Sequence, residues 1–252
     1  MDRRKFFFHP SWPIFYEDNH LLALYKPSGL LTQEDSSEEL SLYSLAKLWI
    51  KETYAKPGNV FLGLVQRLDR AAAGIIVFAK TSKAASRLAK QFRDHVVEKV
   101  YLAVVEGLVE KDTDTLIHYV EPGRTKTLIT QFPGREAKLT YKVLARSYRL
   151  KRTLLEVNLY TGRKHQIRVQ LSSIGHPLLG DYLYGSSFKF PKGALALLAY
   201  RITFLHPTQK IPITLTSPVP TSWPWEGNLS KSKSLFWLWD EIKDHLDLPA
   251  GM

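Results

Sequence analysis

The chain has 252 residues, of which 44% are hydrophobic and 23% charged, a composition typical of a globular protein with a substantial buried core. Lys and Arg number 35 against 24 Asp and Glu, and the formal charge of +11 favours a polyanionic partner, although charge alone also fits a basic protein without one. The absence of cysteine excludes disulfides, thiolate metal sites and a cysteine nucleophile, and no apolar run is long enough to cross a bilayer, so we expect a cytoplasmic protein without membrane contact.

The first third of the chain predicts a strand, a turn and a helix. Residues 21–25 form an apolar run, and Pro27 and Gly29 behind it favour a turn. Ser41 precedes apolar residues that are spaced three and four apart over 42–49, which indicates a helix with a serine cap.

The next segments predict a strand, a helix and a second strand. Residues 74–79 are continuously β-branched, aromatic or small, as in a strand that is covered on both faces. Thr81 or Ser82 can cap a helix whose buried stripe lies within 85–92. Residues 100–105 have the composition of another strand.

The second half continues with strands and one short helix. Residues 139–143 and 155–159 alternate apolar and polar side chains, as half-buried strands do. Helical spacing returns between Thr161, a possible cap, and Gly175, a possible end. Strands and helices are mixed without a strict repeat, so we expect an α+β fold built on one large, mostly antiparallel sheet.

The C-terminal part predicts a linker and a helix. Residues 226–234 are polar, and the apolar residues after them have the spacing of one helical face. Those residues are Leu235, Leu238, Trp239, Ile242 and Leu246. We expect a main domain over 1–225 and, over 226–252, a linker and an amphipathic helix that packs onto the domain or binds a partner.

The segment around Asp69 is the first candidate for chemistry. Arg67 and Arg70 flank this carboxylate, and nearby positive charge favours its ionised form. An ionised carboxylate that is shielded from water is a competent nucleophile. The alternative is a solvated Arg–Asp pair on a surface loop.

A second candidate segment is the basic stretch 159–171. Arg163, Lys164 and Arg168 lie at or near a predicted helix start, where backbone amides and cations together bind phosphate or carboxylate groups. Arg168 lies between two apolar residues, so it can point inward and would then need an anionic partner, for which Asp69 is the candidate. A basic helix that faces water is the alternative.

Together these segments resemble the RluA-like family of RNA pseudouridine synthases. The resemblance covers about residues 14–220 in the family's order of motifs. Its main motifs here are Arg67-Leu68-Asp69 with a small-residue triplet and Gly74, Lys99-x-Tyr101-x-Ala103, and Thr161-Gly162-Arg163-x-His165-Gln166-Ile167-Arg168. Weaker or continuing matches are Lys26–Leu30, Gly134–Ala137, Gly175–Gly185 and Phe204–Pro207.

The resemblance implies the pseudouridine synthase fold, with a sheet in two lobes, flanking helices and an active-site cleft between the lobes. It implies that Asp69 attacks a uridine, that the uracil detaches and rejoins through carbon, and that neither a cofactor nor a metal takes part. Tyr101 matches the tyrosine that stacks on the base and helps to remove the ring proton. Arg168 matches the arginine that pairs with the aspartate.

The resemblance also implies an RNA substrate, either tRNA or rRNA. Arg67 matches the arginine that fills the gap left by the flipped base, since a base inside a folded RNA must leave its stack to be reached. The residues expected to bind RNA are Arg67, Arg70, Arg163, Lys164, His165 and Gln166. We expect a monomeric catalytic domain without an N-terminal accessory domain, in which the basic loop 124–138 contacts RNA or is disordered.

Two departures from the family pattern keep other functions open. Gln66 stands where the family usually has His, and Ala71–Ala73 replaces a segment that usually contains Thr-Ser. These changes concern contacts around the flipped base. An impaired family member that acts as an RNA-binding or chaperone module is therefore an alternative, and a basic protein whose terminal helix recruits a partner is another.

Overall fold

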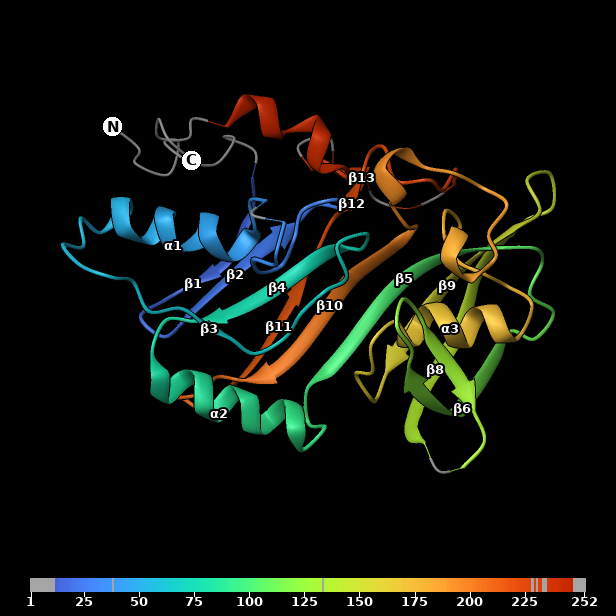
Figure 1. The fold of residues 1–252 in the computed structure, drawn as a ribbon, viewed down its shortest axis with the longest axis horizontal. Coiled ribbons are helices and arrows are strands. Elements are labelled where there is room, and N and C mark those ends of the chain that lie inside the picture. Colours follow the sequence, from blue (N-terminus) through green and yellow to red (C-terminus); the bar gives the residue numbers. More distant parts are fainter. Residues whose placement is uncertain are drawn as a thin grey trace.

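The chain is built around one large β-sheet. The structure is a computed structural model that describes residues 12–37, 39–132, 134–227, 229, 231–232 and 235–246. The sheet has 11 strands, with the path β1-β2-β4-β10-β5-β9-β8-β6-β7, β11 beside β10, and β3 beside β4 (Figure 1). Its strands are β1 (Ile14–Glu17), β2 (Leu21–Lys26), β3 (Gly63–Leu64), β4 (Ala73–Ala79), β5 (Glu98–Glu106), β6 (Thr113–Pro122), β7 (Thr127–Thr130), β8 (Arg135–Ser147), β9 (Arg152–Leu159), β10 (Leu197–Leu205) and β11 (Pro212–Thr216). The helices are α1 (Leu42–Thr53), α2 (Ser82–Arg93) and α3 (Gln166–Ser173), with 3-10 helices at η2 (Tyr182–Tyr184), η3 (Pro191–Gly193), η4 (Trp239–Glu241) and η5 (Lys243–His245).

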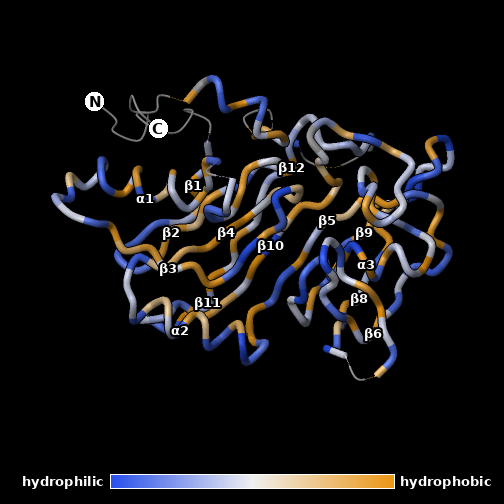
Figure 2. The backbone as a smooth tube through the Cα atoms, viewed as in Figure 1, coloured by the Kyte–Doolittle hydropathy of each residue, from blue (hydrophilic) through white to orange (hydrophobic). Residues whose placement is uncertain are grey.

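The pairing confirms the predicted α+β fold with a mostly antiparallel sheet. Among the described strands of this sheet, the parallel pair is β4 with β10, over two residue pairs, and the other pairs are antiparallel. Figure 2 shows hydrophobic segments along the central strands and hydrophilic ones in the outer loops. None of the helices in the described part of the chain has the length and apolarity that a membrane span requires.

Helices α1 and α2 cover opposite faces of the first half of the sheet. Alternate residues of β2 and β4, such as Leu22 and Phe78, pack with α1 in one core cluster. Their neighbours, such as Leu21 and Val77, pack with Leu88 of α2 in another. Every residue of β4 is buried, which confirms the prediction of a strand covered on both faces. The predicted caps Ser41 and Thr81 begin α1 and α2 through hydrogen bonds of their side chains.

Helix α3 lies beside the other half of the sheet and begins differently from the prediction. Its N-cap is His165, in the left-handed conformation (φ 53°), without a side-chain cap bond. Thr161 is not the cap, because its hydroxyl instead bonds Gln166 Oε1 and accepts from the amide of Lys138. Gly175 follows the helix with φ 83°, as expected for a glycine at a helix end.

The predicted loop 124–138 is largely sheet. Residues 127–130 form β7 and pair with β6, and β8 begins at Arg135. Strand pairing gives the backbone of this segment protein hydrogen-bond partners in place of water. Pro133 lies outside the described residues.

The C-terminal part is not the α-helix that its spacing predicted. Two short 3-10 helices, η4 and η5, stand in its place. The backbone of Trp237 and Trp239 bonds Ser28 instead of continuing a helix, which explains the difference. Leu235, Trp237 and Ile242 are buried in the main core, so the described part of this segment packs onto its own domain.

The predicted polar linker 226–234 is only partly described. Lys231–Ser232 forms a short strand, β13, parallel to β12 (Val219–Pro220). Residues 228, 230, 233 and 234 lie outside the described part. The division at 225 therefore stays a prediction.

Candidate active site

A cleft of about 570 Å³ lies where the two halves of the sheet meet. One wall comes from the segment 64–72 and the end of α2, and the other from β5, β9 and the start of α3. Seven of the predicted site residues line it. They are Arg67, Asp69, Tyr101, Arg163, His165, Gln166 and Arg168.

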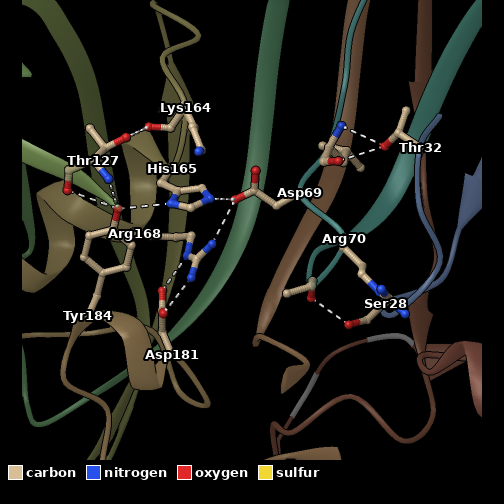
Figure 3. A network of polar contacts seen from close by, with 12 residues as sticks. Ser28, Thr32, Asp69, Arg70, Thr127, Lys164, His165, Arg168, Asp181 and Tyr184 are labelled. Carbon is tan, nitrogen blue, oxygen red and sulfur yellow. Dashed lines mark hydrogen bonds and ion pairs between the residues drawn. The ribbon is translucent and has the colours of Figure 1, made fainter. Parts of the chain in front are cut away.

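Asp69 faces this cleft from a turn in front of β4. Its carbonyl oxygen accepts a hydrogen bond from the amide of Ala72, which closes the turn. Its side chain is 30% exposed, and Oδ2 lies 3.3 Å from Arg168 Nη1 and 3.8 Å from His165 Nε2 (Figure 3). The carboxylate thus lies in the cleft beside a guanidinium from the opposite wall.

Gly74 allows β4 to lie close to β10, and this close packing brings the Asp69 turn near Tyr101 on β5. Strands β4, β10 and β5 lie side by side, with Gly74 opposite Ala199 and Ala199 opposite Tyr101. Gly74 has φ 126°, and a Cβ on it would lie 2.4 Å from the carbonyl oxygen of Ala199. A side chain here would therefore separate β4 from β10.

Arg168 is held by two carboxylates, of which the sequence predicted only one. The residue is 8% exposed, as its apolar neighbours indicated. Its Nε and Nη2 donate to the two carboxylate oxygens of Asp181 at 2.7 and 2.9 Å, and its Nη1 donates to Asp69. Because Asp181 takes two donors in a buried pair, it fixes the plane of the guanidinium that meets Asp69.

Tyr101 is a buried, neutral phenol at the cleft. It lies in the middle of β5, paired with Ala199 on one side and Val157 on the other. Burial raises the pKa of Tyr101 well above its ordinary value, and the negative charge of Asp69 raises this pKa further. The phenol therefore stays protonated at neutral pH and presents an uncharged ring to the cleft.

His165 connects Asp69 to a buried hydrogen-bond network. Its Nδ1 lies 3.1 Å from the hydroxyl of Tyr184, which also bonds the backbone amide and carbonyl of Thr127. Burial lowers the pKa of His165, and the charge of Asp69 opposes part of this shift. Tyr184 thus orients an imidazole that is mostly neutral at pH 7.

The variant Tyr184→Phe tests this network. It leaves the buried amide of Thr127 without its partner at 2.7 Å and removes the contact to His165. We expect the free energy of unfolding to fall by about 1–3 kcal/mol, as for other buried unsatisfied donors. Urea unfolding measures this change, and an effect below about 0.5 kcal/mol, the range of ordinary surface substitutions, would contradict the network.

The turn that carries Asp69 is supported from behind by Lys26. This lysine is fully buried, and its Nζ donates to the carbonyl oxygens of Pro27, Leu30 and Arg70 at 3.0, 2.8 and 3.1 Å. Burial lowers the pKa of Lys26 to about 7, which the charge of Asp69 partly opposes and that of Arg70 reinforces. The sequence motifs assigned Lys26 no role beyond the first position of the weak family match Lys26–Leu30.

Ser28 joins the same turn to the C-terminal segment 235–246, here named the C-terminal strap. Its Oγ donates to the carbonyl oxygen of Ala71 at 2.6 Å (Figure 3). Its backbone amide donates to the carbonyl oxygen of Trp237, and its carbonyl oxygen accepts from the amide of Trp239, at 2.8 and 2.7 Å. Ser28 therefore links the C-terminal strap to the turn that carries Asp69.

The variant Ser28→Ala tests this support. It removes the bond to Ala71 and should lower the free energy of unfolding by about 1 kcal/mol. A small displacement of a reacting group slows chemistry more than binding, so we expect a reaction at Asp69 to slow by about threefold to tenfold under single turnover, at unchanged substrate affinity. Ser86→Ala, at an exposed position of α2, is the control, and equal rates in both variants would exclude a positioning role.

Two predicted RNA-binding residues, Arg70 and Gln166, have side-chain partners elsewhere in the protein, and a third, Lys164, lies outside the cleft lining. Arg70 points away from the cleft, where its Nε donates to Gly29 and its guanidinium forms a two-bond pair with Glu39. Gln166 is buried, and its amide oxygen and nitrogen are both fully used by Thr161, the backbone and Gln170. Lys164 is exposed beside the cleft, and its backbone oxygen accepts from Thr127.

The structure adds cleft residues that the sequence analysis missed. Phe92, Arg93 and His95, at the end of α2, line the cleft together with Lys99. Lys99 was known only as the first residue of the motif Lys99-x-Tyr101-x-Ala103, and its place in the cleft could have been predicted, because it lies two positions before Tyr101 on the same face of a strand. The end of α2 could not, because only the tertiary fold brings it there. In the described part of the chain no group of three or more His, Asp or Glu side chains could hold a metal ion.

The comparison with known families agrees with this geometry. The sequence profile described as RNA pseudouridylate synthase matches residues 20–173, which include Asp69, Tyr101 and Arg168. The chain belongs to this family.

Individual relatives support the assignment. An uncharacterized RNA pseudouridine synthase of Aquifex aeolicus is 39% identical over 208 residues, which are 78% of this chain and 66% of that protein. Ribosomal large subunit pseudouridine synthase D of Xylella fastidiosa is 34% identical over 221 residues, 82% of this chain and 66% of that protein. The chain thus spans slightly less than two thirds of the length of these relatives.

A solved structure shares the fold. The structure titled human RNA pseudouridylate synthase domain containing 4 aligns with a TM-score of 0.69 and 22% identity, over 83% of this chain and 89% of that one. The pseudouridine synthase fold expected from the motifs is therefore confirmed.

Proposed function

We propose that this RNA pseudouridylate synthase family member isomerises uridine in RNA to pseudouridine with Asp69 as the nucleophile. The observation that carries the proposal is the pairing of Asp69 with Arg168, across a cleft that Tyr101 also lines. Arg168 is itself fixed by Asp181, so the carboxylate meets a preorganised cation. Family membership and the names of the relatives support the same reaction.

The residues of the cleft suit the steps of this reaction. The uridine must leave its stack to enter the cleft, and exposed Arg67 at the cleft wall is suited to fill the gap in the RNA. Asp69 attacks either the pyrimidine ring or the anomeric carbon of the ribose, and the uracil detaches, turns and rejoins through C5. The proton on C5 is then lost, and the neutral ring of Tyr101 offers a stacking surface beside Asp69.

The RNA class is part of the proposal. The name of the Xylella relative specifies the large ribosomal subunit, which favours rRNA for that protein. For this chain we propose tRNA or rRNA, bound by a monomer in the cytoplasm. Arg135 and Lys138 lie on β8, where the carbonyl oxygen of Glu136 accepts a hydrogen bond from Arg163 Nε, so both cations lie near Arg163 and can extend the RNA contact.

Tritium release tests the function directly. Formation of the carbon–carbon bond replaces hydrogen at C5, so RNA labelled with tritium at C5 of uridine should release label to water with the purified protein. Absence of release from tRNA, rRNA and total cellular RNA would overturn the enzymatic proposal and leave an RNA-binding module. The altered positions Gln66 and Ala72, which line the cleft, would then be the first residues to restore.

A further inference from the structure

Lys99 is a half-buried cation that the reaction at Asp69 does not use. It lies on β5 at the end of the cleft where α2 ends. Within the described residues no carboxylate lies within ion-pair distance of its Nζ. Burial lowers the pKa of Lys99 to about 8, which reflects the cost of keeping an unpaired charge out of water.

The backbone of His95, at the same end of the cleft, is in a strained conformation that lowers the stability of the fold. It follows the C-cap of α2 with φ 57°, a left-handed conformation in which glycine is the least strained residue. Its ring Nδ1 lies 3.0 Å from the carbonyl oxygen of Tyr160 on the opposite wall. The other histidine of the cleft, His165, is also left-handed, so backbone strain accompanies both cleft histidines.

The charge of the cleft is strongly one-sided. Asp69 is the single carboxylate among the lining residues, and it pairs with Arg168, which it shares with Asp181. The remaining cationic or titratable nitrogen groups on the lining are Arg67, Arg93, His95, Lys99, Arg163 and His165. An anion with more than one charge centre is the ligand that such a lining favours.

We propose that Lys99, Arg93 and His95 form a subsite that binds a backbone phosphate of the RNA next to the uridine held at Asp69. The inference rests on the proposed function and specifies how its substrate is held. Lys99 and Tyr101 point to the same side of β5, about 6–7 Å apart along the strand, so both can contact one nucleotide and its flanking phosphate. A phosphate accepts hydrogen bonds from an ammonium and a guanidinium together, and it supplies the charge that Lys99 lacks.

The variant Lys99→Met separates a binding role from a structural one. If Lys99 binds phosphate, the variant should raise the melting temperature of the free protein and weaken its binding of RNA. Without its unpaired charge the free protein should melt about 2–4 °C higher. Binding of oligouridylate, measured against salt concentration, should lose about 0.7 from the slope of log affinity against log salt, as one phosphate contact to a single strand predicts. His95→Gly should likewise raise the melting temperature and weaken oligouridylate binding.

Two further variants control for charge and for position. Lys99→Arg retains the cation and should restore the salt slope of the wild type. Lys83→Met removes an exposed lysine from the start of α2, outside the cleft, and should leave the slope unchanged. An unchanged slope in Lys99→Met, or an equal loss in Lys83→Met, would overturn the subsite. These readouts need no turnover, so they are independent of a failure of wild-type protein to release tritium.

Discussion

Replacing Asp69 with Asn should reduce tritium release from C5-labelled RNA by at least about a thousandfold, because the amide cannot attack the nucleoside. The side chain keeps its size, and Arg168 keeps its two bonds to Asp181, so the cleft should stay folded. RNA affinity should stay within about threefold of the wild type, because phosphate contacts supply most of it.

Filter binding and single-turnover tritium release on the same preparations measure the two quantities. Asp112→Asn is a suitable control, because Asp112 is an exposed partner of Arg146 and is not part of the cleft lining. Release by Asp69→Asn within about tenfold of the wild-type rate would assign the nucleophile to another group.

The variant Asp181→Ala should have the largest effect on stability. It leaves the buried guanidinium of Arg168 with the carboxylate of Asp69, at 3.3 Å, and the ring of Tyr184 as its partners, so one of its two carboxylates is lost. Breaking a buried ion pair by removing one partner costs about 3–5 kcal/mol. The freed guanidinium can turn toward Asp69, and a displacement of about 1 Å at the reacting group lowers the rate roughly a hundredfold.

Urea unfolding and single-turnover kinetics together decide this prediction. Asp112→Ala removes an exposed ion pair and should change the free energy of unfolding by less than about 1 kcal/mol. If Asp181→Ala has the same free energy of unfolding as Asp112→Ala and isomerises uridine at the wild-type rate, Asp181 does not position Arg168.

The sequence predicted the features that depend on local pattern or on contiguous motifs. The caps Ser41 and Thr81 and the fully buried strand β4 follow from spacing and side-chain type. Asp69 and Arg168 came from motifs about 100 positions apart, and inward burial of Arg168 followed from its apolar neighbours. Each of these signals is contained in a few consecutive residues.

Features that depend on tertiary contacts were either missed or predicted wrongly from the sequence. Arg70 directly follows Asp69 in the sequence, yet the backbone turns here, so that the side chain of Arg70 points away from the cleft and pairs with Glu39. Asp181 becomes the principal partner of Arg168 only because η2 packs against α3. The apolar spacing of the C-terminal strap fitted a helix, but pairing with Ser28 gave its backbone another set of partners.

The pairing of the C-terminal strap with Ser28 joins segments that are far apart in the chain and are therefore synthesised at different times. The Asp69 turn and Lys26 are synthesised well before Trp237 and Trp239, which follow Asp69 by more than 160 residues. Contacts between such distant segments form late, because closing a long loop costs chain entropy. A nascent chain that has not yet reached the C-terminal strap therefore lacks the contacts that Trp237 and Trp239 make with Ser28, behind the turn that carries Asp69.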